Sequence, residues 1–258
     1  MSYLTKQRTF DTFLNLAKNE STRRNQKSVL GHFEKFCLMQ FDRSLETIIE
    51  DLILVTKTES QKIEDLFQEY ISNGFKETNS ARTIRTHYSI LTSYLKYRKI
   101  PIDKEDLRTV LSFPRISYDE LVPMNREIIR KFIDFANTTE KAKLLVQASS
   151  GLRNQEVCGL RKRDIQTDTT RWAIHVSAKL GKGSKARITF ISNETRRFLK
   201  PIIDKLEQDD LIFASSKTSL YHAKQYELKK FDRLREKVGL TEKYDSSNKY
   251  KYSTHSFR

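Results

Sequence analysis

The sequence predicts a mainly helical protein, with an all-α N-terminal domain of four to five helices and an α+β C-terminal domain that holds a small antiparallel sheet. Apolar residues recur at helical spacing within residues 1–112. A proline-bracketed segment at 113–123 interrupts that pattern, which is typical of an exposed linker. Stretches that alternate apolar and polar residues follow within residues 124–258. The predicted domains are therefore 1–112 and 124–258.

The N-terminal domain is predicted to be a compact bundle of short helices. Val29, Leu30 and Phe33 are spaced to share one helical face, and the same rhythm recurs three more times. Pro101 ends the last of these patterns. The four predicted helices span residues 23–41, 45–55, 60–71 and 80–98.

The C-terminal domain is predicted to combine helices with a β-hairpin. Trp172, Ile174 and Val176 alternate with polar residues, as do Ile188 and Phe190, and a basic glycine-bearing turn joins the two stretches. The predicted helices lie around residues 128–136, 142–148, 194–206 and 219–238, with a further helix beginning near 156, a kink at Pro201 and a cap at Gly239. The segment 142–148 is apolar nearly all round, so we expect that helix to be central and buried.

Charge is the first indication of function. The chain has 48 Lys and Arg against 33 Asp and Glu, a formal net charge of +15. Such an excess favours a polyanionic partner, because each cation set against a phosphate releases condensed counterions. A basic protein without a nucleic-acid partner remains an alternative. An acidic membrane surface is disfavoured, because no segment pairs a clean basic face with an apolar one.

Several other classes of protein are disfavoured. No apolar run approaches a membrane span, and residues 1–10 lack the apolar core of a signal peptide. Cys37 and Cys158 are too few and too far apart for a disulfide framework or a zinc ribbon. We therefore expect no metal and a cytoplasmic, nucleoid-associated protein.

Three local patterns carry the chemistry. They are Ser150-Gly151-Leu152-Arg153 followed by Glu156, the turn Gly181-Lys182-Gly183-Ser184-Lys185-Ala186-Arg187, and Thr254-His255-Ser256-Phe257-Arg258. Each is weak alone: Arg153 could be an ordinary arginine at a helix start, His255 a capping histidine, and Glu156 a solvated helix residue. The glycines of the turn lack the spacing of a P-loop, so no nucleotide cofactor is expected.

Together and in this order, the three patterns resemble the signature of the tyrosine site-specific recombinases, the phage integrase family. The likeness covers residues 121–258 and includes Asp210-Leu211-Ile212-Phe213, which is similar to a short segment of that family. It implies that residues 124–258 form a catalytic domain and that residues 1–112 form a helical core-binding, SAM-like DNA-binding domain. It further implies DNA recombination or integration, of the kind mobile genetic elements use, without a cofactor.

The resemblance also implies a role for each site residue. Arg153 and Arg258 would bind the non-bridging oxygens of the scissile phosphate, since planar guanidinium groups give paired hydrogen bonds to oxyanions. Lys182 would protonate the departing 5′ oxygen, although Lys179 and Lys185 compete with it for that role. His255 would assist proton transfer at the tyrosine or brace the phosphate, and Glu156 would buttress the active-site arginine.

The nucleophile is where the resemblance departs from the family. The family places its nucleophilic tyrosine beyond the second arginine, and this sequence ends at Arg258. Tyr244, Tyr250 and Tyr252 precede His255 and fit no family position, so we expect no nucleophile in this chain. The chain would then be a C-terminally truncated fragment, a catalysis-free DNA binder that occupies recombination sites, or a protein whose nucleophile comes from another polypeptide.

The expected partner is double-stranded DNA, with a homo-oligomer, a dimer or tetramer, forming on it. An RNA-associated protein with accidental motifs is a further alternative. Cations at the predicted helix surfaces and on the basic turn are candidate DNA contacts: Arg23, Arg24, Lys27, Arg82, Arg85, Lys179, Lys185 and Arg187.

Overall fold

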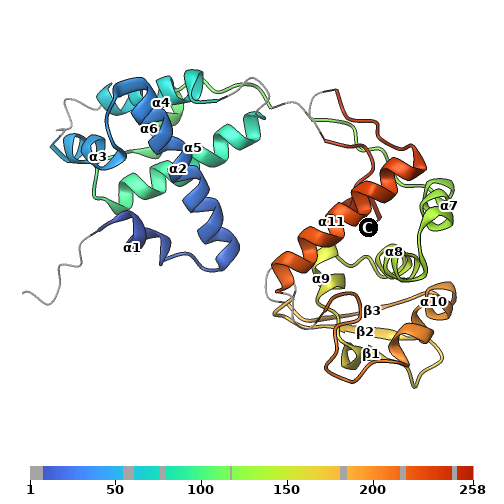
Figure 1. The fold of residues 1–258 in the computed structure, drawn as a ribbon. Coiled ribbons are helices and arrows are strands. Elements are labelled where there is room, and N and C mark those ends of the chain that lie inside the picture. The colour runs from blue at the N-terminus through green and yellow to red at the C-terminus, as the bar shows by residue number, and fades with distance from the viewer. Residues whose placement is uncertain are drawn as a thin grey trace, which may run out of the picture. The chain divides into compact units, whose positions relative to one another are not determined.

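The computed structural model describes residues 8–54, 61–75, 80–116, 118–180, 185–215, 219–245 and 249–257 (Figure 1). The chain divides into two compact units, Met1–Tyr118 and Asp119–Arg258. The division falls inside the segment 113–123 that breaks the helical pattern of the sequence.

The first unit is all-α in its described part. Its helices are α1 (Phe10–Leu14), α2 (Glu20–Phe41), α3 (Leu45–Leu54), α4 (Gln61–Asn73), α5 (Ala81–Tyr97) and α6 (Lys104–Val110). Helices α2 to α5 confirm the four that apolar spacing predicts. The short helices α1 and α6 begin at side-chain caps: Thr9 accepts from the Thr12 N–H, and Asp103 accepts from the N–H groups of Glu105 and Asp106.

The core of the first unit is rich in aromatic residues. Tyr70 of α4 is buried, and its ring contacts Phe33 at 4.8 Å and Phe36 at 5.0 Å between centroids. Its hydroxyl lies 2.8 Å from Nδ1 of both His32 and His87, so the buried oxygen keeps hydrogen-bond partners. This cluster joins α2, α4 and α5.

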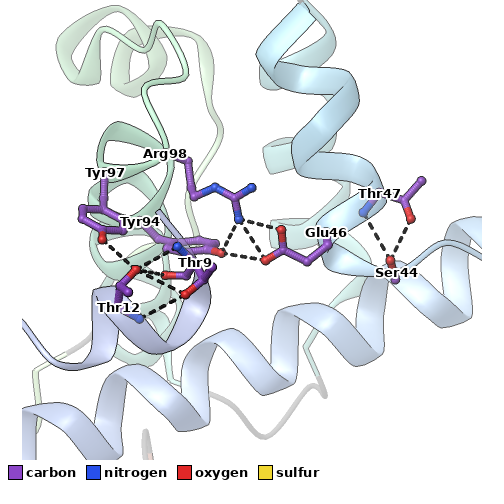
Figure 2. A network of polar contacts seen from close by, with 8 residues as sticks. All are labelled: Thr9, Thr12, Ser44, Glu46, Thr47, Tyr94, Tyr97 and Arg98. Carbon is purple, nitrogen blue, oxygen red and sulfur yellow. Dashed lines mark hydrogen bonds and ion pairs between the residues drawn. The ribbon is translucent and has the colours of Figure 1, made fainter. Parts of the chain in front are cut away.

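A second polar network ties α1 and α3 to α5 (Figure 2). Arg98, which caps the C-terminal end of α5, donates from Nη1 to Oε1 and Oε2 of Glu46 at 2.9 and 2.6 Å. The Tyr94 hydroxyl donates to the same carboxylate at 3.2 Å. On the other side, the Tyr97 hydroxyl donates to Oγ1 of Thr12 at 2.7 Å.

The segment that follows α6 packs in part against α5. Phe113 is half-buried against the core, meets Tyr88 edge-on at 5.1 Å, and lies 4.9 Å beneath the guanidinium of Arg85. The expectation of a wholly exposed linker is therefore wrong at Phe113. Tyr118 is exposed, with the Arg82 guanidinium 5.8 Å from its ring.

The second unit combines helices with a three-stranded antiparallel sheet of order β1-β2-β3. The strands are β1 (Ile165–Gln166), β2 (Ala173–Val176) and β3 (Arg187–Phe190), and Ile174 pairs with both Ile165 and Thr189. The helices are α7 (Arg126–Phe135), α8 (Thr138–Ser150), α9 (Asn154–Cys158), α10 (Asn193–Ile203) and α11 (Leu220–Val238), with 3-10 turns η2 (Lys162–Asp164) and η3 (Thr254–Phe257). The predicted hairpin is confirmed as β2 and β3, whereas β1 was not predicted.

Helix α8 lies between the two hydrophobic clusters of this unit. Ala142 and Val146 join the cluster beneath the sheet, and Leu144 joins a cluster with Phe132 and Phe231. Figure 1 shows the strands and α10 along one side of α8. The prediction of a central, buried helix at 142–148 is confirmed. Among the helices of the described residues, none is long and apolar enough to cross a membrane.

Candidate active site

Arg153 lies where α8 gives way to α9. Gly151 ends α8 with φ of 66°, a left-handed conformation that glycine adopts at little cost. Leu152 is then fully buried, which anchors the chain, and Arg153 is the N-cap residue of α9 with its side chain 30% exposed. A buried neighbour on one side and a helix start on the other fix where this arginine can reach.

Glu156 lies under Arg153 and is buried. Its side chain is 1% exposed, and it accepts from the Arg153 backbone N–H at 2.7 Å and from Arg153 Nη1 at 3.2 Å. Arg187 donates to the same carboxylate from Nη1 at 3.0 Å and from Nη2 at 2.6 Å. The alternative that Glu156 is a solvated helix residue is therefore wrong.

The electrostatics of this carboxylate follow from its partners. Burial by itself would raise the pKa of Glu156, but the hydrogen bonds from Arg187 and Arg153 outweigh burial and hold the pKa below its ordinary value. The hydrogen bond between Arg187 and Glu156 also raises the pKa of Arg187. Glu156 is thus an ionised carboxylate between two guanidinium groups, and the three side chains together carry a net charge of +1.

Both stems of the hairpin formed by β2 and β3 contact the stretch 150–159 that contains Arg153. Thr189 Oγ1 on β3 donates to the Ser150 carbonyl oxygen at 2.8 Å. On the β2 side, Leu180 packs so closely on Gly159 that a Cβ added there would lie 2.5 Å from Leu180 Cδ2. Lys179 and Lys185 are exposed beside the turn. Lys182 lies outside the described residues, within 181–184.

The segment 254–257 is docked on α8. Gln147 Nε2 on α8 donates to the Thr254 carbonyl oxygen at 2.6 Å, and both residues are buried. Phe257 is 3% exposed, with its ring 5.4 Å from that of Phe132 and 5.8 Å from that of Phe231. His255 points away from this core and is exposed. Arg258 lies outside the described residues.

The structure thus attaches three parts of the predicted site to one element. Helix α8 leads directly into Arg153, carries the Ser150 carbonyl that holds β3, and binds the turn that contains His255. Gln147 was missed by sequence reasoning. The signal for it was a long polar residue in the mostly apolar stretch 142–148, where Lys143 is the other.

Residues 123–258 match the model of the phage integrase family. The chain belongs to the phage integrase family. Three solved structures have a similar fold. A lambda integrase dimer bound to a COC′ core site matches with a TM-score of 0.61 and 14% identity, covering 96% of this chain and 66% of that chain. XerH recombinase bound to difH substrate before cleavage matches with a TM-score of 0.58 and 16% identity, covering 96% of this chain and 71% of that chain, and the Tn1549 transposon integrase with circular intermediate DNA matches with a TM-score of 0.53 and 14% identity, covering 89% and 83%. No curated protein sequence matches. These likenesses agree with the mainly helical fold that the sequence predicts.

The tyrosines that precede His255 in this phage integrase homologue have structural partners. The Tyr244 hydroxyl accepts from the Val122 N–H at 3.0 Å. The Tyr250 ring lies 3.5 Å beneath the guanidinium of Arg235, and Tyr252 packs against the cluster that holds Phe257. His255, Tyr244 and Tyr250 border a cavity of about 540 Å³.

The remaining candidate DNA contacts differ in how accessible they are. Arg23, Arg24 and Lys27 are exposed on α2, and Arg24 also pairs with Glu20 at 3.2 Å. Arg82 is exposed on α5, whereas Arg85 is half-buried against Phe113. Within the described ranges, no group of three His, Cys, Asp or Glu side chains is arranged to hold a metal ion.

Proposed function

We propose that this chain is a site-specific DNA recombinase in which residues 119–258 hold a scissile phosphodiester and residues 1–118 bind the same duplex. The observation that carries the proposal is the attachment of Arg153, the hairpin and the His255 turn to a single helix, α8, in a member of the phage integrase family. Residues distant in sequence gain a common support, as a site for one phosphate requires.

The proposed chemistry assigns each residue a step. A tyrosine hydroxyl attacks phosphorus, the P–O5′ bond breaks, a 3′-phosphotyrosine forms, and the 5′ oxygen leaves as a hydroxyl. Arg153 and Arg258 bind the non-bridging oxygens, where negative charge grows. Lys182 supplies the proton to the 5′ oxygen, and His255 takes part in proton transfer at the tyrosine. Glu156 keeps Arg153 in position, and no cofactor takes part.

The nucleophile is proposed to lie outside residues 1–258. Tyr244 accepts a hydrogen bond from Val122, the Tyr250 ring lies beneath Arg235, and Tyr252 packs against a hydrophobic cluster, contacts that support a structural role for each. The chain alone is then expected to bind DNA and activate a phosphate without forming a covalent adduct. A protein that only occupies recombination sites is the alternative.

DNA binding is tested first, by selecting duplexes from a random pool with the intact chain. Affinity is then measured by fluorescence anisotropy on a selected duplex, a scrambled duplex and a structured RNA at matched salt. We expect the selected duplex to bind tightest, with an affinity that falls steeply as salt rises. Preference for the RNA would favour an RNA-associated protein.

Phosphate activation can be tested without the nucleophile. The selected duplex is prepared with a nick that carries a 3′-(p-nitrophenyl phosphate) opposite a 5′-hydroxyl, so that joining makes the P–O5′ bond and releases p-nitrophenolate. We expect the parent chain to join the strands and Arg153→Ala to join them at least about 100-fold more slowly, with little loss of DNA affinity. The matched control is Arg163→Ala, which removes an exposed arginine of the same unit. Equal rates in the parent chain and Arg153→Ala would favour the site-occupying binder.

Covalent chemistry is tested with a nicked suicide substrate. The parent chain is expected to give no covalent protein–DNA adduct. An adduct mapped to Tyr244, Tyr250 or Tyr252 would overturn the assignment of the nucleophile to another segment or chain.

The proposed assembly is a dimer or tetramer on DNA in association with the nucleoid. Its support is the solved lambda integrase, which is a dimer on its core site. Sedimentation of the chain with the selected duplex is expected to give two or more chains per full site, and a strict one-to-one complex would contradict it.

A further inference from the structure

We infer that Arg187 is a positioning residue for the proposed reaction. It pairs with both carboxylate oxygens of Glu156, which leaves the guanidinium of Arg153 able to bind the phosphate. It also connects the hairpin to Arg153 through Glu156. The inference rests on the proposed function. Arg187 was predicted from sequence as a DNA contact, and its pairing with Glu156 was not foreseen.

The hydrogen bonds divide the buried carboxylate between two arginines. Oε1 accepts from Nη1 of Arg153 and Nη1 of Arg187, and Oε2 accepts from the Arg153 backbone and Nη2 of Arg187. Arg187 thus makes the paired, fork-like contact, whereas the Arg153 side chain contributes a single nitrogen. Among the described residues, Nε and Nη2 of Arg153 have no hydrogen-bond partner.

This division has a chemical consequence. A buried carboxylate facing one arginine would pair with it through two parallel hydrogen bonds and neutralise it. Glu156 cannot do this to Arg153 while Arg187 holds both of its oxygens. Two nitrogens of Arg153 therefore remain for the non-bridging oxygens of a phosphate, which prefer the same paired geometry.

Arg187 also lies on the element that carries the turn. Alternation along β3 places Arg187 and Thr189 on the face opposite Ile188 and Phe190, which are exposed. Arg187 binds Glu156 and Thr189 binds Ser150, while Leu180 contacts Gly159 from the other stem. Both stems that flank residues 181–184 are thereby attached to the stretch 150–159 around Arg153.

The test compares Arg187→Gln and Arg187→Lys with the parent chain in single-turnover strand joining on the p-nitrophenyl substrate. We expect Arg187→Gln to lower the joining rate by about 100-fold, the scale of a small misplacement of a catalytic group, while DNA affinity changes only a few-fold. Arg187→Lys should fall between the two, because it keeps the charge but loses the fork. The control Arg171→Gln removes an exposed arginine that lies over Phe190 on the outer face of the sheet, and it should join at the parent rate.

Coupling to Glu156 separates positioning from general damage to the fold. If Arg187 acts through Glu156, adding Arg187→Gln to Glu156→Gln should lower the rate far less than it does in the parent chain. Full additivity would overturn the inference. So would an Arg187→Gln chain that joins at the parent rate while Arg153→Ala does not, and in that case the proposed function would stand.

A spectroscopic readout needs no reaction. Nitrogen-15 NMR of the arginine Nε–H groups should show the Arg153 resonance shifted and more protected from hydrogen exchange in Arg187→Gln than in the parent chain, as Glu156 takes up the paired contact. An unchanged Arg153 resonance in a folded variant would overturn the inference even if no DNA is joined. A parent chain that joins no strands but shows the shift would instead remove the proposed function.

Discussion

Docking of the His255 turn on α8 can be tested by truncating Phe257. Its side chain is 3% exposed and packs against the rings of Phe132 and Phe231. Phe257→Ala removes a fully buried ring and leaves a cavity, a change that costs about 3–5 kcal/mol in well-packed cores. We expect the free energy of unfolding of the second unit to fall by about 3 kcal/mol, at the low end of that range, because the short 3-10 turn can detach locally.

The assay uses the single tryptophan of the chain. Trp172 is buried beneath the sheet of the second unit, so its fluorescence during urea unfolding reports on that unit rather than on residues 1–118. The matched control is Phe135→Ala on α7, where the ring is 58% exposed and truncation should change stability by less than about 0.5 kcal/mol. A double-mutant cycle of Phe257 with Phe132 should give a coupling of about 1 kcal/mol, as expected for an edge-on aromatic pair.

An equally small loss of stability in Phe257→Ala and Phe135→Ala would show that Phe257 does not anchor the turn. The His255 turn would then not be held on the helix that leads to Arg153, and the proposed site would lose one of its sides.

Three further predictions concern other contacts. The pKa of Glu156 is held below its ordinary value of 4.5, so its carboxylate stabilises the second unit above that pH, and this stabilisation is lost as the pH falls through the lower pKa of the folded state. Urea midpoints followed at Trp172 should therefore drop more steeply below about pH 4.5 in the parent chain than in Glu156→Gln. Parallel curves for the two chains would contradict this. Arg98→Met should lower the stability of the first unit by about 1 kcal/mol, because Glu46 is half exposed and can rehydrate. No change in the urea midpoint by circular dichroism would show that the Arg98–Glu46 ion pair of Figure 2 contributes nothing to stability. Burial raises the pKa of both cysteine thiols, that of Cys37 to about 12. Both thiols should therefore react with a disulfide reagent only when their unit unfolds, with Cys37 reporting on the first unit and Cys158 on the second. Labelling at the rate of an exposed thiol would contradict their burial.

Periodicity predicts the long elements of this fold well and the short ones poorly. Helix α2 spans six turns, so several apolar residues mark its buried face. Helices α1 and α6 have only five and seven residues, which is too short for apolar residues to form a pattern. They depend on the caps at Thr9 and Asp103 instead. Strand β1 has two residues and exists because β2 offers it a partner.

The site shows the same division between local and long-range information. Arg153 and His255 were predicted as site residues from short motifs, because each motif is local. The role of Arg187 depends on a carboxylate 31 positions away in sequence, and the role of Gln147 on a carbonyl 107 positions away. Such partners are set by tertiary packing, and a single sequence holds no spacing that encodes them. Phe113 was likewise read as linker because its partners, Tyr88 and Arg85, lie on another element.

A crystal structure of the chain on its selected duplex would show whether Arg153 and His255 act on one phosphodiester. We expect one phosphate with non-bridging oxygens about 3 Å from Nε or Nη2 of Arg153 and with the His255 ring beside it, while Arg187 stays paired with Glu156. Arg153 and His255 on different phosphates, or Arg153 turned onto Glu156 away from the DNA, would contradict it.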